Sequence, residues 1–190
     1  LGNKDLSVYN TDSYSPIHHA LAKLSLKQYV SSEFLPGVST SGTIVNGVRY
    51  EDLQVTSFKD NSFDIVISTE VFEHIPHPYK AFKEVYRILK PGGAHVFTVP
   101  YAANSKRDIN MSFISEEGVL MNGPGEPPDL IPPHYHGDSL RKEGIIVFTI
   151  FTPEMLAKLC AIGFNVETTM IQNAAYGIVG QESIVFTAWK

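Results

Sequence analysis

The stretch from residue 63 to residue 99 constrains the fold of this chain most strongly. Phe63–Ser68 is a short apolar run rich in β-branched residues and follows a polar turn, which is typical of a buried strand. Apolar residues then recur at helical spacing from Tyr79 to Leu89. Lys90–Gly93 is a helix stop signal, and Ala94–Val99 is a second apolar run. A strand, a crossover helix and a strand predict two parallel neighbours in one sheet.

The rest of the chain continues this alternation of strands and helices. Ser15 and Pro16 predict a helix start, as do Thr152 and Pro153. The segment 43–50, with Asn46-Gly47, predicts a short hairpin, an edge segment or a simple turn. The further expected strands are Leu6–Asn10, Gln28–Leu35, Gly144–Phe151, Phe164–Ile171 and Ser183–Trp189. We therefore expect one α/β domain over residues 1–190, with a doubly wound, mostly parallel sheet.

Residues 102–140 interrupt this pattern. The segment contains much of the proline and glycine of the chain and shows neither helical nor strand periodicity. A long irregular stretch inside a compact domain is usually a binding loop or a lid. We expect an irregular insertion over the mouth of a pocket.

Composition excludes several classes of protein. The formal net charge of −5 argues against a nucleic-acid-binding surface, which normally carries a basic patch. No apolar run approaches the roughly 20 residues that a membrane-spanning helix needs. The chain has one cysteine, Cys160, so it has no internal disulfide framework and no cysteine-rich zinc site. These features agree with a cytoplasmic protein.

Polar residues follow several of the expected strands. Asn10–Asp12, Glu33, Asp52 and Ser68–His74 all stand at expected carboxyl ends of strands. In open α/β sheets, ligands bind in the crevice beyond these ends. We expect these residues to converge on one crevice.

The middle of the chain resembles the S-adenosylmethionine-dependent methyltransferases with a Rossmann-like core, of the type 11 kind. The resemblance rests on Asp52, on Phe58–Val66, on Glu73-His74 and on Arg87–Gly93, which occur together at the spacing of that family. It covers about fifty residues. It implies a seven-stranded sheet with an antiparallel terminal strand, and S-adenosylmethionine as the cofactor.

The resemblance also implies roles for individual residues. Asp52 matches the acidic residue that accepts a hydrogen bond from the adenine amino group, and the N–H of Leu53 would face the adenine ring. Glu33 matches the carboxylate that holds both ribose hydroxyls, since two oxygens can accept from two O–H donors. Ser68, Thr69 and Glu70 match the wall beneath the methionine and ribose. His74 matches a histidine beside the cofactor pocket.

The first loop departs from the family pattern. The family has a glycine-rich loop after strand one, whereas Asn10–Pro16 contains no glycine. Side chains fill the space that glycine leaves open, so the loop backbone is not expected to approach the cofactor as closely as in the family. In this chain the methionine end of the cofactor would meet the side chains of Asn10, Asp12 or Ser13.

The insertion contains a second cluster of candidate site residues. His134, Tyr135 and His136 are expected to help recognise the methyl acceptor. A metal site formed by the two histidines and Asp138 is a weaker alternative, because alternate residues of an extended loop point to opposite sides; we predict no metal. A general base would be His74, His134 or His136, with His74 the weak catalytic candidate.

Two functions remain open at this point. The first is methyl transfer from S-adenosylmethionine to an oxygen, nitrogen or carbon atom of a small-molecule or glycan-like acceptor. The second is an inactive methyltransferase-fold binding module, because the glycine-free loop would no longer hold the cofactor productively. A nicotinamide-dependent dehydrogenase is disfavoured, since no G-x-G-x-x-G follows strand one.

Overall fold

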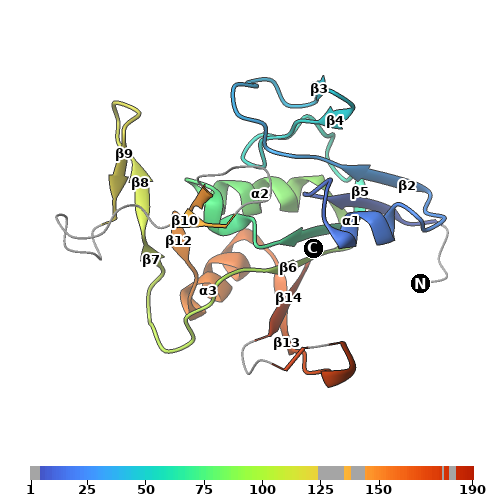
Figure 1. Cartoon of the computed structure of the whole chain (residues 1–190). Coiled ribbons are helices and arrows are strands. Elements are labelled where there is room, and N and C mark those ends of the chain that lie inside the picture. Colours follow the sequence, from blue (N-terminus) through green and yellow to red (C-terminus); the bar gives the residue numbers. More distant parts are fainter. Residues whose placement is uncertain (1–4, 124–134, 138–143, 177, 180–182) are drawn as a thin grey trace.

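A six-stranded sheet forms the centre of the computed structural model, which describes residues 5–123, 135–137, 144–176, 178–179 and 183–190 (Figure 1). The strand order is β13-β14-β6-β5-β1-β2. The strands are β1 (Ser7–Asn10), β2 (Gln28–Ser31), β5 (Phe63–Thr69), β6 (Leu89–Thr98), β13 (Asn165–Met170) and β14 (Ile184–Trp189). β2, β1, β5 and β6 run parallel, and β14 lies antiparallel between β6 and β13. The mostly parallel α/β sheet with an antiparallel terminal strand is thus confirmed.

The sheet has one strand fewer than expected. Where a seventh strand would extend the edge beyond β2, the chain forms only an isolated parallel bridge between Glu33 and Tyr50. The intervening residues form a small hairpin of β3 (Ile44–Val45) and β4 (Val48–Arg49) that turns at Asn46 and Gly47, both with positive φ. Of the interpretations of this segment, the hairpin is the correct one. Its strands are too short to add a ladder to the main sheet.

One face of the sheet carries the core. Tyr9, Val66, His95 and Ala188 lie side by side across four strands, and all are fully buried. α2 (Pro78–Ile88) and α3 (Pro153–Ile162) pack on this face, α2 through Phe82 and Val85 and α3 through Met155 and Leu159. On the other face, α1 (Pro16–Leu21) contacts β2 through His18 and Tyr29 but has no buried residue. The helix cover is therefore much heavier on one face.

The expected turn after α2 is part of a strand. α2 ends at Ile88 and β6 starts at Leu89, so Lys90–Gly93 lies within β6, where the register with β5 shifts. Gly92 has a φ of +78°, which favours glycine. A Cβ on Gly93 would lie 2.9 Å from the carbonyl oxygen of Asp64. The two glycines thus allow the helix to turn directly into the strand.

The insertion is more regular than expected. β7 (Ile109–Asn110) pairs with β12 (Thr149–Ile150), β8 (Ser112–Ile114) with β9 (Leu120–Asn122), and β10 (Tyr135–His136) with β11 (Ile145–Ile146). The β8–β9 hairpin extends away from the main sheet (Figure 1). Two short 3-10 helices, η1 (Phe72–His74) and η2 (Ala174–Tyr176), complete the described elements. None of the described helices is long and apolar enough to cross a membrane.

Candidate functional site

The first loop joins the carboxyl ends of three strands. The N–H of Thr11 donates to Ile67 of β5, and the N–H of Ser32 donates to Asn10. The N–H of Ser13 donates to Glu33 Oε1 at 2.7 Å. The loop after β1, the carboxylate after β2 and the end of β5 therefore meet at one edge, as the sequence predicts for Asn10, Asp12 and Glu33.

The loop makes its turn without glycine because Asp12 caps it. The Asp12 carboxylate accepts from the N–H groups of Tyr14 and Ser15 at 2.7 and 3.0 Å, and no residue of the loop has a positive φ. Burial acts to raise the pKa of Asp12, but these hydrogen bonds outweigh it and the pKa lies below its ordinary value. Asn10 Nδ2 donates to the carbonyl oxygen of Asp12. The side chains of Asn10 and Asp12 thus hold the loop together, whereas the sequence suggested that they contact the methionine end of the cofactor.

Two hydroxyl groups of the same loop are buried without a hydrogen-bond partner in the described part of the chain. They are Thr11 Oγ1 and Ser13 Oγ. A buried hydroxyl without a partner costs about 1–3 kcal/mol, which a bound polar ligand would recover. The sequence analysis placed Thr11 at the end of the first strand but gave only Asn10, Asp12 and Ser13 a contact with the cofactor, because a Thr-Asp-Ser stretch is also an ordinary helix-capping sequence.

Glu33 and Asp52 lie on two neighbouring segments of backbone, and the Glu33 carboxylate also contacts the first loop. Two backbone hydrogen bonds join these segments. The N–H of Glu33 donates to the carbonyl oxygen of Arg49, and the N–H of Glu51 donates to the carbonyl oxygen of Glu33. Asp52 Oδ1 accepts from the N–H of Gln54 at 2.8 Å. Leu53 beside it is buried, with 7% of its surface exposed. The backbone hydrogen bonds thus place the segments of Glu33 and Asp52 side by side, and the N–H of Gln54 orients the Asp52 carboxylate.

Phe34 is an exposed aromatic residue that the sequence analysis did not single out. Its ring is 55% exposed although it follows Glu33 directly, and its centroid lies 5.6 Å from that of Tyr50. An exposed aromatic face beside two carboxylates is suited to stacking on a flat heterocycle. The sequence signal was an apolar residue directly after the acidic residue at the end of the second strand.

The residues after β5 divide into two groups. Ser68 is 1% exposed, and its Oγ lies 2.9 Å from His95 Nε2. Its side chain therefore belongs to the core, which corrects the expectation that it forms part of a ligand wall. Thr69 and Glu70 are exposed at the strand end. Glu70 has a φ of +51°, an uncommon conformation for a residue other than glycine, asparagine or aspartate.

His74 connects the end of β5 to the insertion. Its Nδ1 donates to the carbonyl oxygen of Ile146 in β11 at 2.6 Å, since a carbonyl can only accept. Its Nε2 lies 3.5 Å from Glu73 Oε1. The main-chain oxygen of Glu73 accepts from the N–H of Phe148. Both ring nitrogens of His74 thus face protein groups, which does not suit a general base.

Glu73 is a buried acid. Its side chain is fully buried, and burial together with the neighbouring carboxylate of Glu70 raises its pKa to about 8. This group is therefore largely protonated at neutral pH.

Only part of the expected acceptor cluster can be placed. Tyr135 is 52% exposed and pairs with Ile146, whose carbonyl oxygen holds His74. The backbone of His136 forms the other residue of β10. His134 and Asp138, on which the metal alternative rests, lie outside the described residues. Tyr135 and His74 are thus brought to the same part of the molecule.

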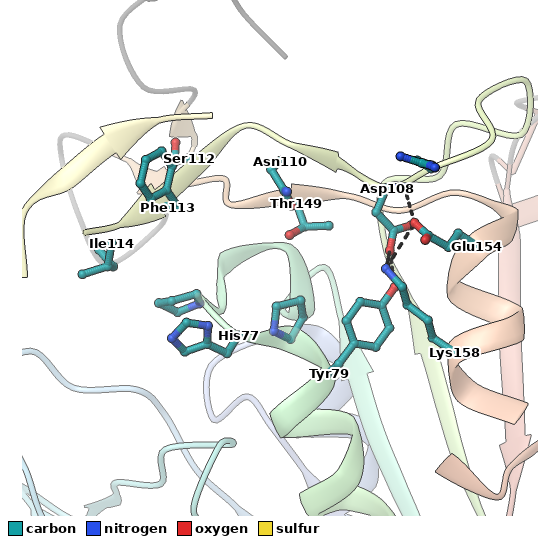
Figure 2. A pocket seen from close by; sticks show the side chains of 13 residues that line it. His77, Tyr79, Asp108, Asn110, Ser112, Phe113, Ile114, Thr149, Glu154 and Lys158 are labelled. Carbon is teal, nitrogen blue, oxygen red and sulfur yellow. Dashed lines mark hydrogen bonds and ion pairs between the residues drawn. The ribbon is translucent and has the colours of Figure 1, made fainter. Parts of the chain in front are cut away.

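A cavity of about 470 Å³ lies between the start of α2, the insertion and the start of α3. Figure 2 shows Tyr79, Glu154 and Lys158 gathered around Asp108. The Asp108 carboxylate accepts hydrogen bonds from the hydroxyl of Tyr79, from Lys158 Nζ and from both the N–H and the hydroxyl of Thr152. Sequence reasoning missed this cluster, because its members are distant in the sequence.

Comparisons with known proteins find a similar family and similar relatives for part of the chain. Residues 17–97 match the family model described as "Methyltransferase domain". Phosphoethanolamine N-methyltransferase 2 of Caenorhabditis elegans is 46% identical over 54 residues, which are 27% of this chain and 12% of that protein. The chain therefore matches only a small part of this relative's length.

Solved structures show the same fold. An S-adenosylmethionine-dependent methyltransferase from Mesorhizobium loti has a TM-score of 0.62 at 18% identity, covering 100% of this chain and 94% of that one. A Burkholderia thailandensis 1,6-didemethyltoxoflavin-N1-methyltransferase, solved with its substrate and S-adenosylhomocysteine bound, has a TM-score of 0.53 at 12% identity, covering 98% and 72%. The resemblance seen in the sequence is thus confirmed, and the fold is the Rossmann-like fold of these proteins.

Proposed function

We propose that this chain, a Rossmann-like relative of the S-adenosylmethionine-dependent methyltransferases, transfers a methyl group from S-adenosylmethionine to a small-molecule acceptor. One observation carries the proposal. The Glu33 carboxylate gathers at the carboxyl edge of the sheet with the buried hydroxyls of Thr11 and Ser13, which have no hydrogen-bond partner among the described residues. Ligands of open α/β sheets bind at this edge.

The residues present fit the nucleoside half of the cofactor. Glu33 offers carboxylate lone pairs to the ribose hydroxyls, and the N–H of Ser13 orients it. Asp52 would accept from the adenine amino group, the Leu53 N–H would face the ring, and the exposed Phe34 ring provides a stacking surface. When bound, the cofactor supplies an electrophilic methyl group on a sulfonium sulfur.

The methionine half of the cofactor would not meet the side chains of Asn10 and Asp12, which the sequence suggested. Asn10 and Asp12 are engaged within the loop, so the hydroxyls of Thr11 and Ser13 are the donors that remain. Thr69 and the carboxylate of Glu70 are exposed at the end of β5, and Glu70 would pair with the cofactor's amine. The glycine-free loop can therefore bind through side-chain hydroxyls.

The insertion contributes positioning and exclusion of water. His74 holds β11, Glu73 holds the segment before β12, and Tyr135 lies next to that anchor. Methyl transfer depends mainly on in-line placement of the acceptor, and this needs no general base when the acceptor is already nucleophilic. We propose that Tyr135, with His134 and His136, borders the acceptor.

The range of acceptors follows from the relatives. One relative is described as a phosphoethanolamine N-methyltransferase and another, from Aspergillus fumigatus, as a sterol 24-C-methyltransferase. Their named acceptors are small molecules that receive the methyl group on nitrogen or on carbon. A small-molecule acceptor is therefore favoured over a glycan-like one. The comparisons give no support to the inactive binding module.

Calorimetric titration with S-adenosylhomocysteine tests the cofactor site. Glu33→Gln and Asp52→Asn should each weaken binding about tenfold, since each removes a charge-assisted hydrogen bond. Glu167→Gln, a matched change of an exposed residue on β13, should leave the affinity unchanged. Equal affinities for all four proteins would contradict the site. An absence of binding by the unchanged chain would favour the inactive module.

A further inference from the structure

The hairpin of β8 and β9 extends away from the main sheet (Figure 1). In its turn the N–H of Gly118 donates to the carbonyl oxygen of Ser115, and Gly118 has a φ of +79°. A short loop that ends in a glycine of this conformation is a common hairpin connection. A two-stranded hairpin without a third strand or a covering helix is only marginally stable in water. Its outer face is therefore a candidate for contact with another surface.

One face of this hairpin is apolar and exposed. Alternate residues of a strand share a face, so Phe113 and its cross-strand partner Met121 lie on the same face as Val119. Phe113 is 42% exposed, Met121 45% and Val119 54%. We call these three residues the apolar face of the hairpin. The opposite face begins at Ser112, which the protein itself covers, since only 3% of its surface is exposed.

The two ends of the apolar face carry charges of opposite sign. Glu116 and Glu117 are exposed in the turn. Ser115 lies on the same side of β8 as Phe113, and its Oγ donates to Glu117 Oε2 at 2.8 Å, so this carboxylate lies toward the apolar face. At the other end, Lys106 is exposed shortly before β7. The tip of the hairpin is thus acidic, and the segment before its base ends in a cation.

Lys106 is the positive charge that remains at the base of the insertion. Its neighbour Arg107 lines the cavity beside Asp108 and Glu154. Lys158 forms ion pairs with both acids, at 3.0 Å and 3.1 Å. These four groups carry two positive and two negative charges, so they balance one another. Lys106 forms no ion pair among the described residues, and its flexible side chain is suited to reach a carboxylate of a second molecule.

These features suit a second copy of this chain. Two copies related by a twofold axis bring the same surface of each together. When the two hairpins run in opposite directions, the acidic tip of each copy points toward the basic end of the other, so the surface is complementary to itself in charge. A membrane surface with anionic lipids would repel the two glutamates of the tip and the formal net charge of −5.

We propose that the apolar face of the β8–β9 hairpin joins two copies of this chain in an antiparallel, twofold dimer. Phe113, Val119 and Met121 of each copy pack against the same face of the other, and Glu117 pairs with Lys106 of the partner subunit. Phe113 also lines the cavity beside α2, so the dimer contact borders that cavity. The dimer does not depend on methyl transfer.

Sedimentation velocity over a wide range of protein concentrations tests the apolar contact. The unchanged chain should pass from monomer to dimer as its concentration rises, and the double variant Phe113→Ser/Met121→Ser should weaken the dimer at least about tenfold. Met170→Ser, a change of a 60% exposed methionine on β13, should leave the dimer unchanged. A chain that stays monomeric at every concentration would overturn the proposal, as would a dimer that the double variant leaves intact. A monomer that binds vesicles of anionic phospholipid would assign the apolar face to a lipid surface.

Reversal of the two charges tests the antiparallel arrangement. Glu117→Lys and Lys106→Glu should each weaken the dimer about fivefold at low salt, because each places like charges together. The two changes in one chain should restore most of the affinity, since the pair forms again with its signs exchanged. Glu167→Lys, at an exposed position of β13, is the matched control and should have no effect. A combined variant that dimerises no better than the single ones would contradict the arrangement.

Discussion

Ser68 and His95 form a polar pair inside an otherwise apolar core. The His95 ring stacks on Phe97 with centroids 4.5 Å apart, and its Nε2 lies 2.9 Å from Ser68 Oγ. Its Nδ1 has no partner among the described residues. Burial lowers the pKa of His95 to about 3, so the ring is neutral at physiological pH.

Removing one member of this pair should destabilise the protein more than removing both. Ser68→Ala should lower the free energy of unfolding by about 1–3 kcal/mol, because Nε2 then also lacks a partner. Adding His95→Phe replaces the buried polar ring by an apolar one of similar shape and should recover most of the loss. Urea denaturation of the two single variants and the double variant measures this. Additive losses would mean that the hydrogen bond contributes nothing.

At the scale of elements, two carboxylates organise two loops. Asp12 closes the first loop through hydrogen bonds to main-chain N–H groups, and Asp108 joins the base of the insertion to α2 and α3. Tyr79 and Lys158 come from different helices, so Asp108 connects three segments. The hydrogen bond to Asp108 and burial also raise the pKa of Tyr79 above its ordinary value, burial being the larger cause.

Two substitutions of Asp12 in the first loop should differ in their effect on S-adenosylhomocysteine affinity. Asp12→Ala removes the capping acceptor and should weaken S-adenosylhomocysteine binding about fivefold, corresponding to about 1 kcal/mol, since Ser13 would no longer be held beside Glu33. Asp12→Asn keeps an acceptor oxygen and should bind nearly as tightly as the unchanged chain. If both variants bind alike, the turn does not shape the site.

A substitution of Asp108, at the base of the insertion, should lower the stability of the protein. Asp108 has a side chain that is 5% exposed and accepts from Tyr79, Thr152 and Lys158. Asp108→Asn leaves Lys158 beside an uncharged amide and should lower the free energy of unfolding by about 2–4 kcal/mol. Glu116→Gln, an exposed change in the same insertion, should have no measurable effect. Denaturation midpoints in urea decide between the two results, and an Asp108→Asn midpoint equal to that of the unchanged chain would contradict the role of Asp108.

At the scale of the whole molecule, two buried groups set the pH dependence of stability with opposite signs. Glu73 has a pKa of about 8 in the folded protein against 4.5 in the unfolded chain, so the folded state keeps a proton that the unfolded chain releases and stability falls between these pH values. His95 has a pKa of about 3 against 6.5, so the unfolded chain takes up a proton first and stability falls as the pH drops from 6.5 to 3.

The two effects predict a maximum of stability between pH 4.5 and pH 6.5, where they oppose each other. Glu73→Gln should abolish the decline toward pH 8, because a neutral amide has no proton to lose. Thermal melting temperatures from pH 4 to pH 9 provide the measurement, with Glu116→Gln as the exposed control. A Glu73→Gln profile that still declines above pH 6.5 would refute the assignment to Glu73.

The sequence alone indicated the central strands and helices of the main sheet and their order. Phe63–Ser68 and residues 94–98 form strands because β-branched apolar runs fit a buried sheet. Pro153 and Gly163 bound α3 because of their backbone preferences. The parallel arrangement and the convergence of Asn10 and Glu33 also followed from local pattern, since strand ends of a parallel sheet share an edge.

Only the tertiary structure decided which polar groups are available for a ligand. The register of β5 against β6 places Ser68 opposite Phe97 and next to His95, so its hydroxyl is used in the core. The Asp12 carboxylate is used within its own turn, whereas Thr11 Oγ1 has no hydrogen-bond partner in the part of the chain that the structure describes. Asp108 meets Tyr79 and Lys158 across long intervals of sequence. Local pattern shows where a strand ends, but hydrogen bonds between distant segments determine which of its polar atoms remain for a ligand.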